Sequence, residues 1–219
     1  MKYHGIIFDL DGTLIDSLRD IVDSWNQALL ICGFPSIHND KLTEAIKRGK
    51  ESVLDVIVPK TEPPSAADAV LTAYKDCYRQ NWNRHTQVYS GVNELLAEIY
   101  RRGIKCAVLS NKAQDMTELC CNTFLLTEGI SIVCGASEKY LPKPSPAQAL
   151  EIGRKFALPY AKIALIGDTE IDLKTASNAG FDSLLATWGA GLNASLNMPY
   201  PVTTLNSPRN VLDYINNFA

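Results

Sequence analysis

The sequence contains no long run of apolar residues. A helix that crosses a membrane needs about 20 of them in succession, so we expect no membrane-spanning segment and no membrane partner. The N-terminal stretch MKYHGIIFDLDG also lacks an extended apolar segment followed by small residues. We therefore expect no signal peptide.

The sequence also lacks an excess of charge of either sign. It has 21 Lys and Arg against 24 Asp and Glu, which gives a formal net charge of -3. The basic residues form no stripe of the kind that follows a phosphate backbone. We therefore expect no nucleic-acid partner.

The six cysteines form no CxxC pair and show no spacing typical of a metal site. Cys106, Cys120 and Cys134 lie inside apolar patterns, which is where a free thiol is usually buried. This usage fits a reducing compartment, and we expect a cytoplasmic protein.

A chain of 219 residues with 46% hydrophobic residues can bury a substantial core. Beyond residue 91, apolar runs typical of buried strands alternate with stretches of helical periodicity. This alternation predicts a doubly wound α/β fold, in which a parallel sheet carries helices on both faces. We expect strands over 6–8, 104–110, 130–135, 162–167 and 181–187, and helices over 93–103, 113–124, 145–157, 170–180 and 208–218.

The stretch that follows the first strand has a different character. No convincing strand pattern appears in it, and its helical segments are separated by prolines. We expect helices over 18–32, 39–48, 50–57 and 65–84. The sequence therefore predicts an all-helical insertion over 17–88 in a core domain formed by 1–16 and 89–219.

The helix expected over 145–157 has the clearest start signals in the chain. Ser145 can act as its N-cap, and Pro146 suits the first helical position. Gln148 stands three residues after Ser145, where it can complete a capping box. We expect the side chain of Gln148 to bond the backbone at this helix start.

A pair of acids follows the first expected strand, in the stretch GIIFDLDGTLIDS. Asp9 and Asp11 are separated by one residue, so in an extended chain their carboxylates point to the same side. Carboxylates beside a buried strand are costly unless something compensates their charge. An Asp-Gly pair alone is a common turn signal, but the full pattern is more specific and indicates a divalent cation site.

Three further strands end in polar residues that a site can use. Ser110 and Asn111 follow the second strand and can either bind a phosphate or cap a helix. Lys143 stands between two prolines, so it is held more stiffly than a solvated lysine. Asp168 follows the fourth strand, and Asp172 lies in the next first turn, where an acid also suits the helix dipole. Because ligands of parallel sheets bind beyond the carboxyl ends of the strands, we expect these groups to converge.

In order, the four strand ends carry Asp-x-Asp, Ser-Asn, Lys-Pro and Gly-Asp-Thr-x-x-Asp. This series resembles the four motifs of the haloacid dehalogenase superfamily, in its phosphatase branch. The resemblance covers 5–17 and 91–190, and the helical insertion falls where that superfamily carries its type 1 cap. Thr187-Trp188-Gly189 is similar to the phosphoglycolate phosphatase-like group.

The resemblance implies an enzyme, a phosphoric monoester hydrolase that acts on a small phosphorylated metabolite. Asp9 would be the nucleophile that becomes transiently phosphorylated, and Asp11 would be the general acid and base. We expect Mg²⁺ as the cofactor, bound by the Asp9 carboxylate, the Asp11 main-chain carbonyl and Asp168.

The resemblance also suggests supporting roles around these acids. Ser110, Asn111 and Lys143 would bind the remaining phosphate oxygens. Asp172 would orient the site from behind the metal or hold a water molecule. Thr13 would hydrogen-bond near Asp11 and fix its direction.

A helical cap would exclude water during the first step and select the leaving group. The segment Lys47-Arg48-Gly49-Lys50 lies between two expected helices of the cap. Arg48 and Lys50 could there meet an anionic substrate, such as a phosphate ester that carries a carboxylate. The same segment could equally be a solvated loop that uses a glycine for its turn.

Other activities are weighed against this one. A sugar phosphomutase that resembles this chain would carry a His at the position of Ile21, and a dehalogenase would lack the second acid, Asp11. Pyrophosphatase and nucleotidase activities stay open. A non-catalytic member kept for binding or regulation is disfavoured, because every polar group that the mechanism needs is present. The sequence does not indicate an oligomeric state.

Overall fold

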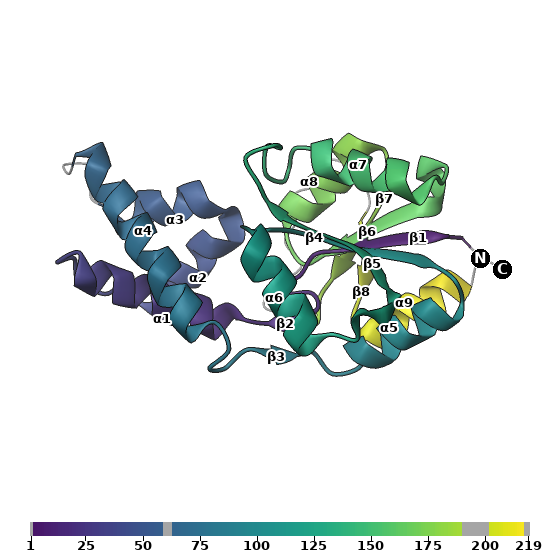
Figure 1. The fold of residues 1–219 in the computed structure, drawn as a ribbon, viewed down its shortest axis with the longest axis horizontal. Helices are drawn as coiled ribbons and strands as arrows, with labels where there is room; N and C mark the ends of the chain where they lie inside the picture. Colours follow the sequence, from purple (N-terminus) through teal and green to yellow (C-terminus); the bar gives the residue numbers. More distant parts are fainter. Residues whose placement is uncertain (1, 59–62, 190–201, 217–219) are drawn as a thin grey trace. The chain divides into compact units, whose positions relative to one another are not determined.

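The computed structural model describes residues 2–58, 63–189 and 202–216. The chain forms two compact units (Figure 1). Met1–Asp16 and Val88–Ala219 form the first, which we call the core unit, and Ser17–Gln87 forms the second, the helical unit. No helix within the described ranges is long and apolar enough to cross a membrane.

A six-stranded sheet organises the core unit, and every strand pairs in parallel with its neighbours. In spatial order the strands are β5 (Ile130–Ala136), β4 (Lys105–Ala113), β1 (Gly5–Phe8), β6 (Ile163–Gly167), β7 (Asp182–Ala186) and β8 (Thr203–Leu205). The first strand of the chain therefore lies inside the sheet, between β4 and β6. Its four residues are all buried, as expected for a parallel strand covered on both faces.

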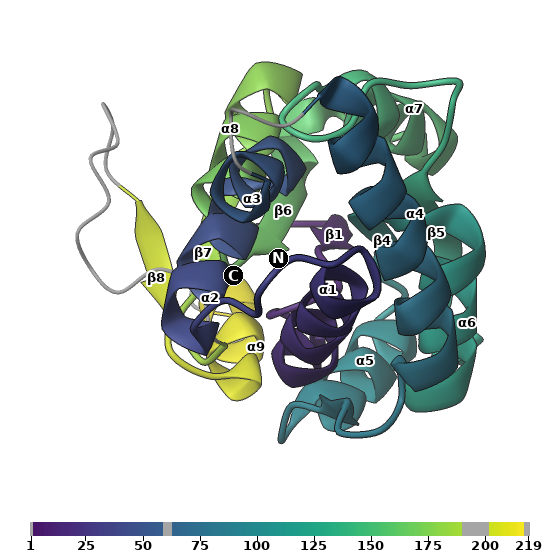
Figure 2. The ribbon, with the colours of Figure 1, turned by 90° about the vertical axis from the view of Figure 1, so that its left-hand side faces the viewer.

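Helices cover both faces of the sheet, which confirms the predicted doubly wound α/β fold. Figure 2 shows α7 and α8 on one face and α5 and α9 on the other. The helices of this unit are α5 (Val92–Arg101), α6 (Gln114–Phe124), α7 (Ala147–Phe156), α8 (Glu170–Ala179) and α9 (Pro208–Asn216), with 3-10 turns at Thr127–Gly129 and Tyr160–Lys162. Apolar side chains of β1, β4 and β6, such as Ile7, Leu109 and Leu165, pack with Phe156 of α7 in one buried cluster.

The helical unit contains α1 (Leu18–Ile31), α2 (Asn39–Arg48), α3 (Lys50–Ile57) and α4 (Pro64–Asn81). It buries its own apolar cluster, in which Trp25 of α1 stacks on Tyr74 of α4 with ring centroids 3.9 Å apart. The carboxylate of Asp20 is buried and accepts hydrogen bonds from the backbone N–H groups of His85 and Thr86. The hydroxyl of Thr86 also donates to it, at 2.7 Å.

Three short strands were not predicted. β2 (Ile15–Asp16) and β3 (Gln87–Val88) form a separate two-stranded sheet, and β8 adds a sixth strand to the main sheet. Two or three residues show too little alternation to indicate a strand, and their pairing depends on neighbours that are distant in the sequence. β4 also continues to Ala113, three residues beyond its expected end.

The expected capping box at the start of α7 is wrong. The helix is assigned from Ala147, and one predicted contact at its start is present, because the hydroxyl of Ser145 accepts from the backbone N–H of Ala147 at 3.4 Å. The side chain of Gln148 is buried instead and its Nε2 donates to the carbonyl of Gly135 in β5, at 2.8 Å. A buried carbonyl needs a donor, and this tertiary bond therefore determines where the Gln148 side chain lies.

The two interpretations of Gln148 predict different effects of Gln148→Glu on the stability of the fold. A capping box would tolerate Glu, whereas the structure places its carboxylate against the Gly135 carbonyl with no donor between them. We expect the substitution to lower the free energy of unfolding by about 1–3 kcal/mol in urea titrations. Gln80 is exposed on α4, so Gln80→Glu should change it by less than about 0.5 kcal/mol. Equal stability of the two variants would contradict this assignment.

Candidate active site

The register of the sheet brings the polar strand ends together. Phe8 of β1 lies opposite Val108 of β4 on one side and Ile166 of β6 on the other. Asp9 follows Phe8 directly, while Ser110 and Asp168 each follow the opposite residue by two positions. Groups 58 to 159 positions apart in the sequence therefore meet at one edge of the sheet, as its parallel topology requires.

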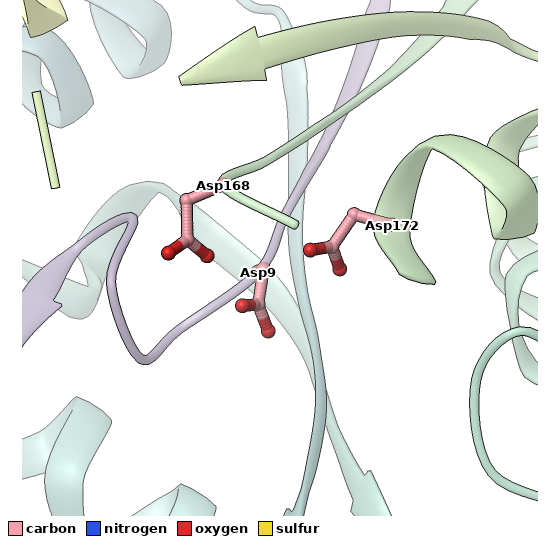
Figure 3. Close-up of side chains that lie close together, drawn as sticks. All are labelled: Asp9, Asp168 and Asp172. Atoms are coloured by element: carbon pink, nitrogen blue, oxygen red, sulfur yellow. The ribbon is translucent and has the colours of Figure 1, made fainter. Parts of the chain in front are cut away.

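Three buried carboxylates form the centre of the site, those of Asp9, Asp168 and Asp172. Asp9 and Asp168 follow β1 and β6, while Asp172 belongs to α8 (Figure 3). Each residue offers an oxygen that lies within 4.8 Å of the others. Such a cluster is unfavourable by itself, because like charges repel and burial removes the water that would solvate them.

Burial and neighbouring charges shift the pKa values of Asp9 and Asp168. Burial raises the pKa of Asp9 to about 7, and the nearby carboxylates of Asp172 and Asp11 add to this, although Lys143 opposes it. Burial and the charges of Asp9 and Asp172 raise the pKa of Asp168 well above its ordinary value. Within the described part of the chain, Oδ1 of Asp168 is buried without a hydrogen-bond partner.

Lys143 supplies positive charge to two of the three acids. Its Nζ lies 2.7 Å from Oδ1 of Asp9 and 2.5 Å from Oδ1 of Asp172. Burial alone would lower the pKa of Lys143, but the two carboxylates raise it above its ordinary value. The side chain of Asn111 holds this lysine by its backbone, accepting from its N–H at 2.8 Å and donating to its carbonyl at 3.1 Å.

Asp172 is held on both sides. Its Oδ2 accepts hydrogen bonds from the backbone N–H and the hydroxyl of Thr169, at 3.1 and 2.6 Å, in a capping box that opens α8. Its Oδ1 receives Lys143. The expected position of Asp172 in the first turn of this helix is confirmed, and its contacts fix both its carboxylate and the ammonium beside it.

Asp11 lies outside the buried cluster and has a different partner. Its Oδ1 is 2.5 Å from Nζ of Lys112, a residue to which the sequence analysis gave no role. Lys112 directly follows Ser110 and Asn111, but 101 positions separate it from Asp11, so only the strand register reveals this pair. The hydroxyl of Ser110 accepts from the backbone N–H of Lys112, at 3.1 Å.

Thr13 does not form the hydrogen bond that was expected of it. Its hydroxyl is buried and has no partner among the described residues. Its backbone carbonyl is held instead, by the indole N–H of Trp188 at 2.9 Å. Thr13 therefore shapes the Asp9–Thr13 turn through its main chain, and Trp188 after β7 supports that turn.

Two glycines allow the acids to come this close. Gly12 has a φ of +85°, and a Cβ on it would collide with the carboxylate of Asp168. A Cβ on Gly167 would likewise overlap the side chain of Asp172. Both positions therefore need glycine for backbone conformation or for space.

The charges around the site fit a divalent cation. When ionised, Asp9, Asp11, Asp168 and Asp172 bring four negative charges and the ammonium groups of Lys112 and Lys143 bring two positive ones, which leaves two negative charges for a cation to balance. Among the described residues, Asp168 has no ion-pair partner, and its Oδ1 is the orphaned oxygen of the cluster. Oxygen ligands of this kind suit hard divalent cations.

The remaining candidates are the predicted phosphate-binding residues Ser110 and Asn111 and the predicted cap residues Arg48 and Lys50. Ser110 is buried within β4, and the Asn111 side chain is engaged with Lys143, so their contacts with phosphate stay a prediction. Arg48 is exposed at the end of α2, and Gly49 follows with a φ of 103°. Lys50 begins α3, but its side chain lies outside the described residues.

Known proteins are similar to this chain in sequence or in fold. Phosphoglycolate phosphatase of Aquifex aeolicus is 27% identical over 212 residues, which cover 97% of this chain and 96% of that protein. A protein named as a pyrophosphatase, PpaX of Caldanaerobacter subterraneus, is 27% identical over 197 residues, covering 86% and 83%. The crystal structure of a predicted phosphoglycolate phosphatase from Haemophilus somnus has a TM-score of 0.88 at 23% identity, over 99% of both chains.

The family profile of the haloacid dehalogenase-like hydrolases matches residues 6–186, from the second residue of β1 to the end of β7, and this range includes Asp9, Asp168 and Asp172. This match covers most of the chain and confirms the superfamily that the four strand-end motifs indicated. The chain belongs to the haloacid dehalogenase-like hydrolase family.

Proposed function

We propose that this protein is a Mg²⁺-dependent phosphatase that hydrolyses a small phosphorylated metabolite through an aspartyl-phosphate intermediate. The main support is the pairing of Asp9 with the buried ammonium of Lys143, next to an acid cluster whose charge a divalent cation would balance. Phosphoryl transfer depends on such positioning and charge neutralisation.

The proposed reaction has two steps. The Asp9 carboxylate attacks phosphorus in line and the bond to the leaving alcohol breaks, while Asp11 donates a proton to that alcohol. Water then attacks the phosphorus of the aspartyl phosphate, Asp11 takes its proton, and inorganic phosphate and free Asp9 are released. Nζ of Lys143 lies 2.7 Å from Oδ1 of Asp9, where its ammonium could contact an oxygen of the transferred phosphoryl group.

The proposed metal ligands are the carboxylates of Asp9 and Asp168 and the main-chain carbonyl of Asp11. When bound, Mg²⁺ would supply the positive charge that lets a phosphate dianion approach these acids. Asp172 would act from behind them, since both its oxygens already have partners. The hydroxyl of Ser110 and the amide of Asn111 would bind further phosphate oxygens.

The helical unit would be the cap that selects the leaving group, and 17–88 would be its extent. The Aquifex relative supports phosphoglycolate as the substrate, since its name specifies phosphoglycolate and the match covers nearly the whole chain. The PpaX relative supports a pyrophosphatase as the second candidate. Comparing phosphate release from 2-phosphoglycolate and from pyrophosphate separates the two.

Asp9→Asn tests the nucleophile. The amide keeps an acceptor for Lys143 but cannot form the acyl phosphate, so phosphate release should fall by a factor on the order of 10⁴ or more, without loss of thermal stability. Phosphate release from p-nitrophenyl phosphate and 2-phosphoglycolate, with thermal melting, measures both. Asp213→Asn, at an exposed position of α9, is the matched control and should keep full activity. Substantial turnover by the Asp9→Asn variant would exclude Asp9 as the nucleophile.

Magnesium should stabilise the protein more at high pH than at low pH. Because the pKa of Asp9 is raised to about 7, the metal-free folded state holds extra protons. The stability that these protons contribute is fully present below the ordinary pKa range of carboxyl groups, and it is lost as the pH rises through about 7. Mg²⁺ competes with these protons, so it binds best when they are gone.

We therefore expect 10 mM MgCl₂ to raise the melting temperature by about 2–6 °C at pH 8, relative to EDTA, and by much less at pH 5.5. Asp168→Asn should melt higher than the parent protein without metal at pH 8, because it removes a buried charge, and it should lose most of the magnesium response. An equal magnesium shift at both pH values would argue against a site made of these acids.

The cap residues are tested by Arg48→Ala with Lys50→Ala. If these side chains meet the carboxylate of the substrate, KM for 2-phosphoglycolate should rise about tenfold while kcat changes little, because a binding contact is lost. KM for p-nitrophenyl phosphate, which has no carboxylate, should stay the same. Lys41→Ala, at an exposed position of α2, controls for loss of charge. An unchanged KM for 2-phosphoglycolate would remove both residues from substrate binding.

A further inference from the structure

Lys112 is an unusual lysine for the end of a strand. Its side chain is only 7% exposed, and its Nζ lies 2.5 Å from Oδ1 of Asp11. The side chain of Asp11 is 23% exposed, so the pair is partly shielded from solvent, and its charge-assisted hydrogen bond is stronger than that of a fully exposed pair. Ion pairs between exposed side chains, in contrast, contribute little.

The backbone of Lys112 is fixed as firmly as its ammonium. Its N–H donates to the hydroxyl of Ser110 at 3.1 Å, and its carbonyl accepts from the hydroxyl of Thr117 in α6 at 3.0 Å. Its Nζ also lies 3.7 Å from Sγ of Cys120 on the same helix. The ammonium is therefore presented from a rigid support made by β4 and α6.

The two buried lysines divide the two acids of the Asp-x-Asp motif between them. Lys143 holds Oδ1 of Asp9, the proposed nucleophile, and Lys112 holds Oδ1 of Asp11, the proposed acid and base. Each acid thus has one oxygen tied to a fixed cation. The orientation of each carboxylate is then set before the substrate arrives, which is what efficient proton and phosphoryl transfer needs.

We propose that Lys112 is the positioning residue for Asp11: its ammonium holds Oδ1 and so fixes the direction of the carboxylate that acts on the leaving group. This inference rests on the proposed function, because it gives a purpose to Lys112 only if Asp11 transfers the proton. In this role Lys112 contacts neither phosphorus nor the metal, and it acts only through Asp11. Its loss should therefore be felt wherever proton donation matters and nowhere else.

The leaving group provides the test. p-Nitrophenolate leaves without much help from an acid, whereas the alcohol of 2-phosphoglycolate needs a proton. For Lys112→Met we expect kcat/KM to fall about 100-fold with 2-phosphoglycolate and less than about 5-fold with p-nitrophenyl phosphate. Lys112→Arg keeps the charge and should restore part of the loss with 2-phosphoglycolate.

Two further variants make the comparison specific. Lys105→Met removes a lysine from the other end of the same strand, where its ammonium donates to the carbonyl of Phe156, and it should affect both substrates equally or not at all. Adding Lys112→Met to Asp11→Asn should cost little more than Asp11→Asn alone, because the group being positioned is already gone. Thermal melting of each variant checks its fold.

An equal loss of kcat/KM for both substrates, or no loss for either, would overturn the assignment, as would full additivity with Asp11→Asn. If Lys112→Met does not fold, Lys112→Gln is judged by the same comparison of the two substrates. A parent protein that hydrolyses neither substrate with Mg²⁺ would instead overturn the proposed function itself. The two failures are therefore distinguishable.

Discussion

The burial of several carboxylates at one edge of a sheet is the constraint on which the rest of the site depends. Asp9, Asp168 and Asp172 are almost fully inaccessible to water, and their charges repel one another. Without compensation such a group would favour protonation or unfolding. The protein compensates in part with the ammonium of Lys143, which lies beside Asp9 and Asp172, and the remaining negative charge matches a divalent cation.

Much of the surrounding structure serves to hold this arrangement in place. Asn111 fixes the backbone of Lys143, and Thr169 fixes the carboxylate of Asp172. The indole N–H of Trp188 holds the turn after Asp9 by donating to the main-chain carbonyl of Thr13. Glycines stand where any side chain would push two acids apart. Most of these supports act through the backbone, so the geometry depends on the folded sheet as a whole.

The sequence was informative where the signal is local. Apolar runs and helical periodicity gave the parallel sheet and its helices, and acids that directly follow apolar strands indicated Asp9 and Asp168. The sequence was uninformative where a contact depends on register. Lys112 reaches Asp11 across 101 positions, and Gln148 bonds Gly135 rather than its own helix start. A residue with two polar partners within reach cannot be assigned from spacing alone, because tertiary packing decides between them.

The buried carboxylate of Asp20 has a consequence for how the helical unit is built. It joins the first helix of this unit to the backbone of His85 and Thr86, 65 and 66 positions later, so the unit's beginning and end meet within itself. A segment closed in this way enters and leaves its host at neighbouring points. Such a segment is a self-contained module, which can lengthen, shorten or be exchanged during evolution while the register of the sheet that hosts it is preserved.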